Sequence, residues 1–534
     1  MTILGVSINH SRIYFWALVL AAVSLPLSKF TLSISIITLL TNWVLEGDYI
    51  NKLNRLKKNV AFWSLLAIFI VHLIWLINTN NYSYAFHDLK NKIILLVFPF
   101  IIFSSNPLSP KDLRNILLWF SAGVIVSSLI STAILVGLID LPVSSNHGIS
   151  IFISHIRFAL LINVAIFSLG YYVITNKYNL SFSVKCIITV SIIWLVVFLF
   201  LLKSLTGIII FLFVLLLLVG YISFSIKYIV YRLFLQLGLI TLFLVSASFI
   251  SHSVSRFYSI DRIDYSTLEK FTLSGNLYIH DKSDQQIENG HYVWLYYCKE
   301  ELEQEWNKRS SIPLNSIDKK GQLIHYTTIR YLTSKGLRKD SVGVSHLTQK
   351  DIKNIESGMA NHIYADKYAL YPRIYQVLWE IDVYRKGQNP AGNSTTQRII
   401  FLKTAFKIIK TNLWTGVGTG DVQDEFNKQY EQDNSQLPAN RRLRAHNQWI
   451  TFLLTFGIFG FLIILIALFY PLIRLKAFRS YLFTMFFIIA FLSMFNEDTL
   501  ETQTGISFFS YFYSLFLLEI KTFKSKLKSN EQDK

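Results

Sequence analysis

Runs of apolar residues long enough to cross a bilayer constrain this chain more than any other feature of its sequence. A transmembrane helix needs roughly 17–25 predominantly apolar residues. The runs lie at about 12–28, 30–46, 59–78, 92–105, 115–138, 158–175, 185–202, 204–225, 229–250, 447–472, 480–495 and 504–521. The fourth run is short and contains Pro99, so we expect a broken or partly inserted helix there. The sequence therefore predicts an all-α polytopic membrane protein with about twelve transmembrane helices.

The composition agrees with this class. Of the 534 residues, 52% are hydrophobic and only 16% are charged, and the mean hydropathy is +0.41. A soluble protein of this size would carry more charge. The net charge of +18 could indicate nucleic acid, but in a membrane protein it is more typical of basic loops that face anionic lipid headgroups. No nucleic-acid partner is therefore expected.

The charges between the apolar runs predict which side of the membrane each loop faces. Cytoplasmic loops carry an excess of Lys and Arg. With the N-terminus in the cytoplasm, the basic stretch NKLNRLKKN (51–59) is cytoplasmic and the acidic stretch NEDTLETQTG (496–505) lies on the opposite side. The same bias places both termini in the cytoplasm and the long polar region 251–446 outside.

The order of apolar and polar regions predicts four parts of the chain. Region 1–250 holds about nine helices, 251–446 is an outer domain, 447–521 holds about three helices, and 522–534 is a cytoplasmic tail. The outer region is too long for a passive loop. It mixes helical periodicity with turn signals, so we expect a large, mostly helical domain between the ninth and tenth helices.

Basic residues stand on the outer side, against the usual bias, just before the tenth apolar run. The sequence RLRAHNQWITFLLTFGIFG (442–460) carries Arg442, Arg444 and His446 at alternate positions. Arginine presents a fork that matches phosphate oxygens, and histidine can take up a proton near neutral pH. Together they suit a reaction in which a hydroxyl attacks and a phosphate leaves. The alternative is that these cations only contact lipid phosphates at the interface.

A second outward cation, Arg398, opens an amphipathic stretch that leads to WTGVGTGD (414–421). Gly418 and Gly420 allow tight turns there. No Lys-Ser/Thr pair follows the last glycine, so this stretch is not a P-loop, and a structural turn is the simpler interpretation.

Two more cations lie at outer ends of apolar runs. Arg157 is found in SHIRFALL (154–161) and Lys203 in the tight turn LLKSLTG (201–207). A charge at that depth is costly unless it is paired or functional, although an ordinary interfacial cation would explain both. The sequence has no HExxH, GxSxG or CxxC motif and no outer carboxylate cluster with ligand spacing, so no metal or cofactor is expected.

These segments resemble a known family. RIIFLKTAFKIIKTNLWTGVGTGD (398–421), followed by 442–460, resembles the signature of the O-antigen ligase superfamily. Its members share an Arg at the start of a helix, a Gly-x-Gly turn, and His-Asn ahead of a span ending in Gly-Ile-x-Gly. They also share the twelve-span layout with a large periplasmic region. Segments within 251–395 resemble a Bacteroidota-type branch of this superfamily.

The resemblance implies a multi-pass protein of the bacterial inner membrane, with its active site facing the periplasm. Members transfer a glycan from a polyprenyl (undecaprenyl) diphosphate carrier to a periplasmic hydroxyl acceptor, without metal or nucleotide. By resemblance, Arg398 binds the donor's diphosphate and His446 assists the attacking hydroxyl. Arg442, Arg444, Arg157 and Lys203 are further candidates for diphosphate binding, with Asn447, Gly418 and Gly420 in supporting roles.

The resemblance leaves the acceptor open. An O-antigen ligase of lipopolysaccharide biosynthesis uses the lipid A core, a Wzy-like polymerase uses another carrier-linked repeat, and an oligosaccharyltransferase uses a protein side chain. A transporter of anionic lipids is the alternative outside this class; the nearly uncharged spans and the lack of an internal repeat disfavour it. Many ligases also carry a Ser-Arg-Gly-like motif where this chain reads Ser204-Leu205-Thr206-Gly207, which leaves Lys203 or Arg157 to supply the charge.

Overall fold

We describe the fold from a computed structural model of the chain. It describes residues 2–3, 6–7, 9–141, 146–175, 179–366, 368–387 and 392–532, with the side chains of 521–532 left aside. All side chains of the predicted tail 522–534 therefore lie outside the described part of the structure. The chain divides into two compact units, Met1–Ile226 with Gly387–Lys534, and Lys227–Lys386.

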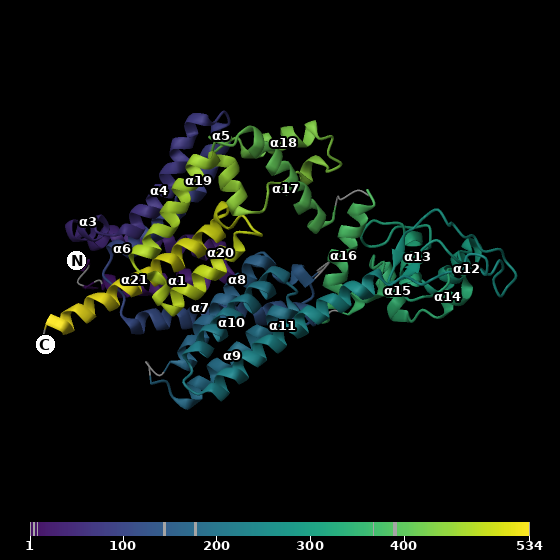
Figure 1. The fold of residues 1–534 in the computed structure, drawn as a ribbon, viewed down its shortest axis with the longest axis horizontal. Coiled ribbons are helices and arrows are strands. Elements are labelled where there is room, and N and C mark those ends of the chain that lie inside the picture. Colours follow the sequence, from purple (N-terminus) through teal and green to yellow (C-terminus); the bar gives the residue numbers. More distant parts are fainter. Residues whose placement is uncertain are drawn as a thin grey trace. The chain divides into compact units, whose positions relative to one another are not determined.

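Helices make up nearly all of the first unit (Figure 1). Its N-terminal part contains β1 (Thr2–Ile3), β2 (Val6–Ser7), α1 (His10–Leu27), α2 (Lys29–Glu46), α3 (Tyr49–Lys57), α4 (Val60–Ile74), η1 (Trp75–Asn78), α5 (Tyr82–Lys92), α6 (Ile94–Ser104), α7 (Pro110–Leu135), η2 (Asn146–Ile149), α8 (His155–Ile174), α9 (Phe182–Leu201) and α10 (Leu205–Ser225). Its C-terminal part contains α17 (Ser394–Thr411), α18 (Val422–Gln432), η5 (Ala439–Arg441), α19 (Gln448–Arg474), η6 (Ala477–Arg479), α20 (Tyr481–Ser493), η7 (Thr499–Glu501) and α21 (Gln503–Gln532).

Helix ends in this unit follow local sequence signals. Ser109 caps α7 and forms a capping box with Asp112, and Pro110 occupies the first turn. Ser28 caps α2 by accepting a hydrogen bond from the N–H of Thr31. Packing then brings distant segments together: α4 lies against α19, α6 against α21, and α8 against α20. The N-terminal and C-terminal parts of the chain thus form one helical assembly.

All twelve predicted apolar runs are helical, and the all-α membrane class is confirmed, but the count of twelve spans is not. Within the described residues, eight helices are long and apolar enough to cross a membrane: α1, α4 with η1, α7, α8, α9, α10, α11 (Ile229–Tyr258) and α19. α2 and α3 qualify only as a pair bent by 116°, which allows up to nine spans. α6 and α20 have 11 and 13 residues, so they extend only about 16–20 Å against a hydrocarbon core of about 30 Å. α21 begins with Gln503 and carries Glu519 within its apolar part.

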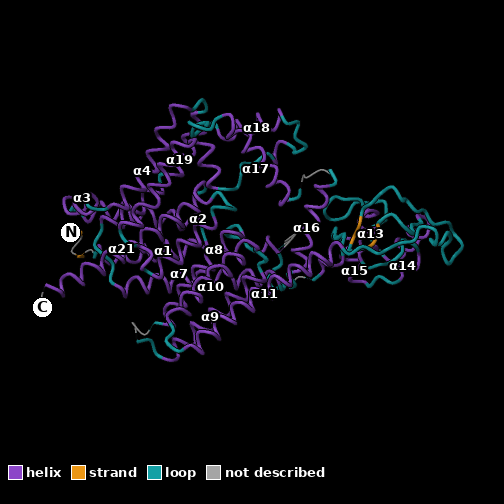
Figure 2. Tube along the Cα trace, viewed as in Figure 1, coloured by secondary structure: helices purple, strands orange, loops and turns teal. Residues whose placement is uncertain are grey.

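The second unit combines helices with a long irregular stretch (Figure 2). Its elements are α11, β3 (Ile287–Glu288), β4 (His291–Tyr292), α12 (Lys299–Arg309), α13 (Ile324–Ser334), α14 (Ser341–Ser345), α15 (Gln349–Glu356), η4 (His362–Ala365) and α16 (Tyr371–Arg385). β3 and β4 pair antiparallel, with Ile287 opposite Tyr292. Trp306, Leu302 and Ile329 lie in its apolar core.

The unit boundaries differ from the predicted domain boundaries. The predicted outer region 251–446 is divided, because its first part belongs to the second unit and residues 392–446 pack with the first. The predicted ninth span, α11, groups with the second unit. Which side of a membrane each part faces stays a prediction.

Candidate functional site

Arg398 lies in the first turns of α17 and contacts the loop between α20 and α21. We name this loop (residues 494–502) the acidic loop. The guanidinium Nη1 donates to the backbone oxygen of Asn496 at 2.9 Å and to its side-chain oxygen at 2.6 Å. Nη2 donates to Oε1 of Glu497 at 2.9 Å. The predicted diphosphate-binding arginine is therefore held by a carboxylate 99 positions further along the chain.

Arg157 meets the same carboxylate from α8. Its Nη2 lies 4.0 Å from Oε2 of Glu497, so the two oxygens of one carboxylate each face one guanidinium. The Arg157 and Arg398 side chains are 22% and 28% exposed, which leaves both accessible. Among the described residues, Nε of Arg157 has no hydrogen-bond partner. Two predicted cations from separate helices are thus brought together around Glu497.

His446 lies beside this pair, in the turn that precedes α19. Its backbone is left-handed, with φ of +49°, which turns the chain sharply before the helix begins. Its ring lies 5.7 Å from that of Phe401, one turn along α17 from Arg398. Asn447 caps α19 by accepting from the N–H of Ile450 at 3.1 Å, and it donates to the backbone oxygen of Phe495 at 2.8 Å. Asn447 therefore ties the start of α19 to the acidic loop.

The surroundings of His446 favour its neutral form. Burial is the main cause of a lowered pKa at His446. The negative charge of Glu497 opposes this change, and the positive charges of Arg398 and Arg157 add to it. A neutral imidazole can accept a proton, which is the state that a general base requires.

Lys203 lies in the turn between α9 and α10, as predicted, with its side chain buried and its backbone left-handed at φ +53°. Ser204 then caps α10. The hydroxyl of Thr206 accepts a hydrogen bond from the side-chain amide of Asn496. The segment where the resemblance expects an arginine thus contacts the acidic loop through a neutral hydroxyl.

Arg444 belongs to a separate cluster. Its Nη1 lies 3.6 Å from Oε2 of Glu501, and its guanidinium lies over the ring of Tyr84, 4.9 Å from the centroid, and donates to the Tyr84 hydroxyl. Glu501 also contacts Nζ of Lys92 at 2.6 Å and accepts from the Gln448 amide at 2.8 Å. We name these five residues the closed cluster. The side chains of Arg444 and Lys92 are 13% and 1% exposed.

Arg442 stabilises the turn that precedes it. Its Nε donates to the backbone oxygen of Leu437 at 3.1 Å, and its Nη1 lies 3.6 Å from Glu431. Its own backbone oxygen accepts from the Gln423 amide. The structure therefore places Arg442 and Arg444 in different surroundings from Arg398, although all three were predicted to bind diphosphate.

The glycine turn packs between helices. Gly418 has φ of +94°, and a Cβ there would lie 2.2 Å from the backbone oxygen of Asn78; a Cβ on Gly420 would lie 2.2 Å from that of Asn81. The N–H of Gly418 donates to the backbone oxygen of Thr455 in α19 at 3.0 Å. The glycines thus allow close contact between this turn, α19 and the segment that joins η1 to α5. The turn therefore has a packing role, and a supporting role of Gly418 and Gly420 in the site stays a prediction.

One segment of the chain matches a known family. Residues 354–465 match the sequence model described as O-antigen ligase (Wzy_C). This part of the chain is similar to the O-antigen ligase family. This confirms the predicted resemblance to the O-antigen ligase superfamily; the Bacteroidota-type branch stays a prediction. No curated protein matches the chain.

The O-antigen ligase match contains Arg398, Arg442, Arg444 and His446, whereas Arg157, Lys203 and the acidic loop lie outside it. The site around Arg398 and His446 is therefore completed by segments before and after the matched domain. Glu497 and Asn496 are the residues that sequence analysis missed. The acidic stretch 496–505 lies on the same predicted side as the outward cations, and this shared side was the signal that could have found them.

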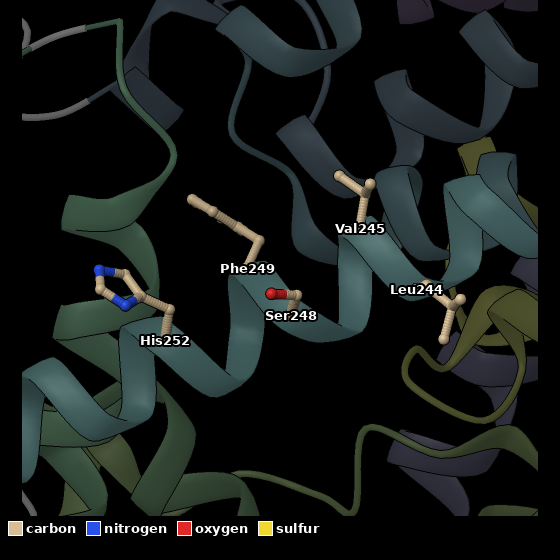
Figure 3. A pocket seen from close by; sticks show the side chains of 5 residues that line it. All are labelled: Leu244, Val245, Ser248, Phe249 and His252. Carbon is tan, nitrogen blue, oxygen red and sulfur yellow. The ribbon is translucent and has the colours of Figure 1, made fainter.

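Two further observations concern ligands. In the ranges that the structure describes, no three His, Cys, Asp or Glu side chains are grouped so that they could hold a metal ion. In the second unit, a hollow along α11 is lined by Leu244, Val245, Ser248, Phe249 and His252 (Figure 3). All five side chains come from one helix, and only His252 can ionise, so this hollow provides no second reactive group.

Proposed function

We propose that this protein transfers a glycan from a polyprenyl-diphosphate carrier to a hydroxyl acceptor, as an O-antigen ligase of the bacterial inner membrane. The observation that carries the proposal is the meeting of Arg157, Arg398 and His446 around Glu497. Two guanidinium groups suit the charge of a diphosphate, and a neutral imidazole suits the removal of a proton from a hydroxyl.

The proposed reaction has one displacement step. His446 accepts the proton of the acceptor hydroxyl as its oxygen forms a bond with the anomeric carbon of the donor glycan. The bond from that carbon to the diphosphate oxygen breaks, and the electron pair leaves with the diphosphate. Arg398 and Arg157 stabilise the charge that develops on the leaving group. Attack opposite the leaving group inverts the anomeric centre.

The chemistry needs no further energy source. The periplasm lacks ATP, and the diphosphate linkage of the donor already makes the transfer favourable. We expect transfer by the purified protein, measured with a lipid-linked glycan and a lipid A core acceptor, to persist in a chelator. Loss of transfer in the chelator, restored by a divalent ion, would contradict a metal-independent mechanism.

The acceptor is assigned by the glycans of a deletion strain. If the protein is a ligase, the deletion strain accumulates long polymer that is not joined to the lipid A core. If it is a polymerase that uses the same donor, the strain instead carries a single repeat on that core. We expect the first pattern. If the long polymer forms and is joined to the lipid A core as in the wild type, but a protein target lacks its glycan, the protein is an oligosaccharyltransferase.

The proposed orientation has a separate test. Reporter fusions at Asp340 and at the C-terminus should report the periplasm and the cytoplasm, respectively. A cytoplasmic reporter signal at Asp340 would contradict a periplasmic outer region.

A further inference from the structure

Glu497 has no role in the reaction described above, yet it lies at the centre of the cationic site. Its Oε1 is 2.9 Å from Arg398 and its Oε2 is 4.0 Å from Arg157. Its side chain is 10% exposed. Two arginines brought this close without a counter-ion would repel each other. One carboxylate therefore allows two cations from separate helices to occupy one site.

The position of Glu497 is fixed by its neighbours. Its backbone N–H donates to the backbone oxygen of Ser493 at 2.9 Å, which continues the hydrogen bonding of α20. The preceding residue, Asn496, contacts both Arg398 and Thr206, and Asn447 holds the backbone oxygen of Phe495. The segment that carries Glu497 is thus held by contacts from α10, α17 and the start of α19. A side chain fixed in this way can fix others.

We propose that Glu497 is a positioning residue that holds Arg157 and Arg398 side by side, next to His446, as a clamp for the donor's diphosphate. This inference rests on the proposed function. It also assigns Arg157 as the second guanidinium of the site, in the absence of an arginine at 204–207.

Four groups define the surroundings of His446. Arg398 and the apolar Phe401 face it from α17, Arg157 from α8, and Glu497 from the acidic loop. Of the charged groups, only Glu497 raises the pKa of His446. If this charge is removed, the pKa of His446 falls, and the base remains neutral to a lower pH.

Two substitutions of Glu497 separate the effect of its charge from the effect of its side-chain length. Glu497→Gln keeps the length of the side chain and removes its charge, so the acidic limb of the pH profile of kcat/KM should move to lower pH. Glu497→Asp keeps the charge and shortens the side chain, so the acidic limb should stay and the clamp should loosen. We expect the aspartate variant to bind a short-chain polyprenyl diphosphate without sugar about tenfold more weakly.

A double variant and a matched control complete the test. Because Glu497 holds both arginines, Glu497→Asp should weaken binding of the sugar-free polyprenyl diphosphate less in an Arg157→Ala background, where only Arg398 remains to be held, than in the wild type. Glu425→Gln removes one carboxylate from an exposed ion pair with Lys428 and should leave both readouts unchanged. An unshifted acidic limb in Glu497→Gln, or wild-type affinity in Glu497→Asp, would overturn the inference.

The two proposals fail differently. Wild-type protein that does not bind the sugar-free polyprenyl diphosphate would overturn the proposed function. Wild-type protein that binds it, with equal binding by Glu497→Asp, would overturn only the role of Glu497. Because binding is measured without turnover, this comparison does not depend on knowing the acceptor.

Discussion

Glu497 and Glu501 lie four positions apart in the acidic loop, and each carboxylate is paired with two cations. Around Glu501, the side chains of Arg444 and Lys92 are 13% and 1% exposed; Arg444 also donates to the Tyr84 hydroxyl, and the Gln448 amide donates to Glu501. Around Glu497, the two arginines are about a quarter exposed, and Nε of Arg157 has no partner among the described residues. We name Arg157, Arg398, His446 and Glu497 the open cluster.

The exposure of a cation indicates whether it can contact a ligand or only stabilises the fold. A buried ion pair is poorly accessible to a ligand, and losing one partner leaves an uncompensated charge. A partly exposed guanidinium can still bind an anion. Sequence alone placed Arg444 and Arg398 in the same class, whereas their surroundings separate them.

The largest expected effect on turnover is at His446, the proposed general base of the open cluster. His446→Ala should lower kcat by about 10²–10⁴-fold, because a general base contributes a factor of this size. Binding of the sugar-free polyprenyl diphosphate should survive. Because the pKa of His446 is lowered in the free protein, the acidic limb of the kcat/KM profile should lie below about pH 6.5, the ordinary pKa of histidine.

Glutamine provides the control for His446. It preserves size and hydrogen bonding but cannot accept a proton, so His446→Gln should be as slow as the alanine variant. Near-normal turnover of His446→Gln would show that the imidazole only shapes the turn before α19.

The next effect concerns Arg398. Arg398→Ala should reduce kcat/KM for the lipid-linked donor by about 10²–10³-fold, since it removes a donor of charge-assisted hydrogen bonds to the leaving group. Arg398→Lys should recover only part of this loss, because lysine lacks the guanidinium fork. Equal kinetics of the lysine variant and the wild type would indicate a simple point charge at this position.

The closed cluster should respond in stability. Glu501→Gln leaves Lys92 and Arg444 buried without their shared counter-ion, which should cost about 3–5 kcal/mol in the free energy of unfolding. We expect a lower thermal unfolding midpoint of the purified protein in detergent. For the fraction that remains folded, the KM for the donor should be close to the wild-type value. If Glu501→Gln is as stable as the wild type and has a raised KM for the donor, the closed cluster takes part in donor binding.

The smallest effect is expected at Arg442. Its contacts are with the turn at Leu437 and with the exposed carboxylate of Glu431, and exposed ion pairs contribute at most about 1 kcal/mol. Arg442→Ala should therefore change kcat/KM for the donor by less than about fivefold. A loss as large as that of Arg398→Ala would place Arg442 beside the diphosphate and remove the distinction drawn between the two arginines.

The sequence by itself determined where the helices form and which segment matches the ligase family. Apolar runs form membrane helices because an unpaired backbone cannot be tolerated in lipid, and this requirement is local. Asn447 and Ser109 cap their helices by contacts within three residues. Helix length was less predictable: α6 and α20 end after 11 and 13 residues, although the apolar runs around them are longer.

Tertiary structure alone decided which cations share a carboxylate. Arg157, Arg398 and Glu497 come from three separate segments, and Arg444 reaches Tyr84 across 360 positions. No spacing or periodicity encodes such contacts, since they depend on how α5, α8, α17, α19 and the acidic loop pack. Opposite charges attract whatever their separation in the sequence, but only packing sets the distance at which one carboxylate can hold two guanidinium groups beside a half-buried imidazole.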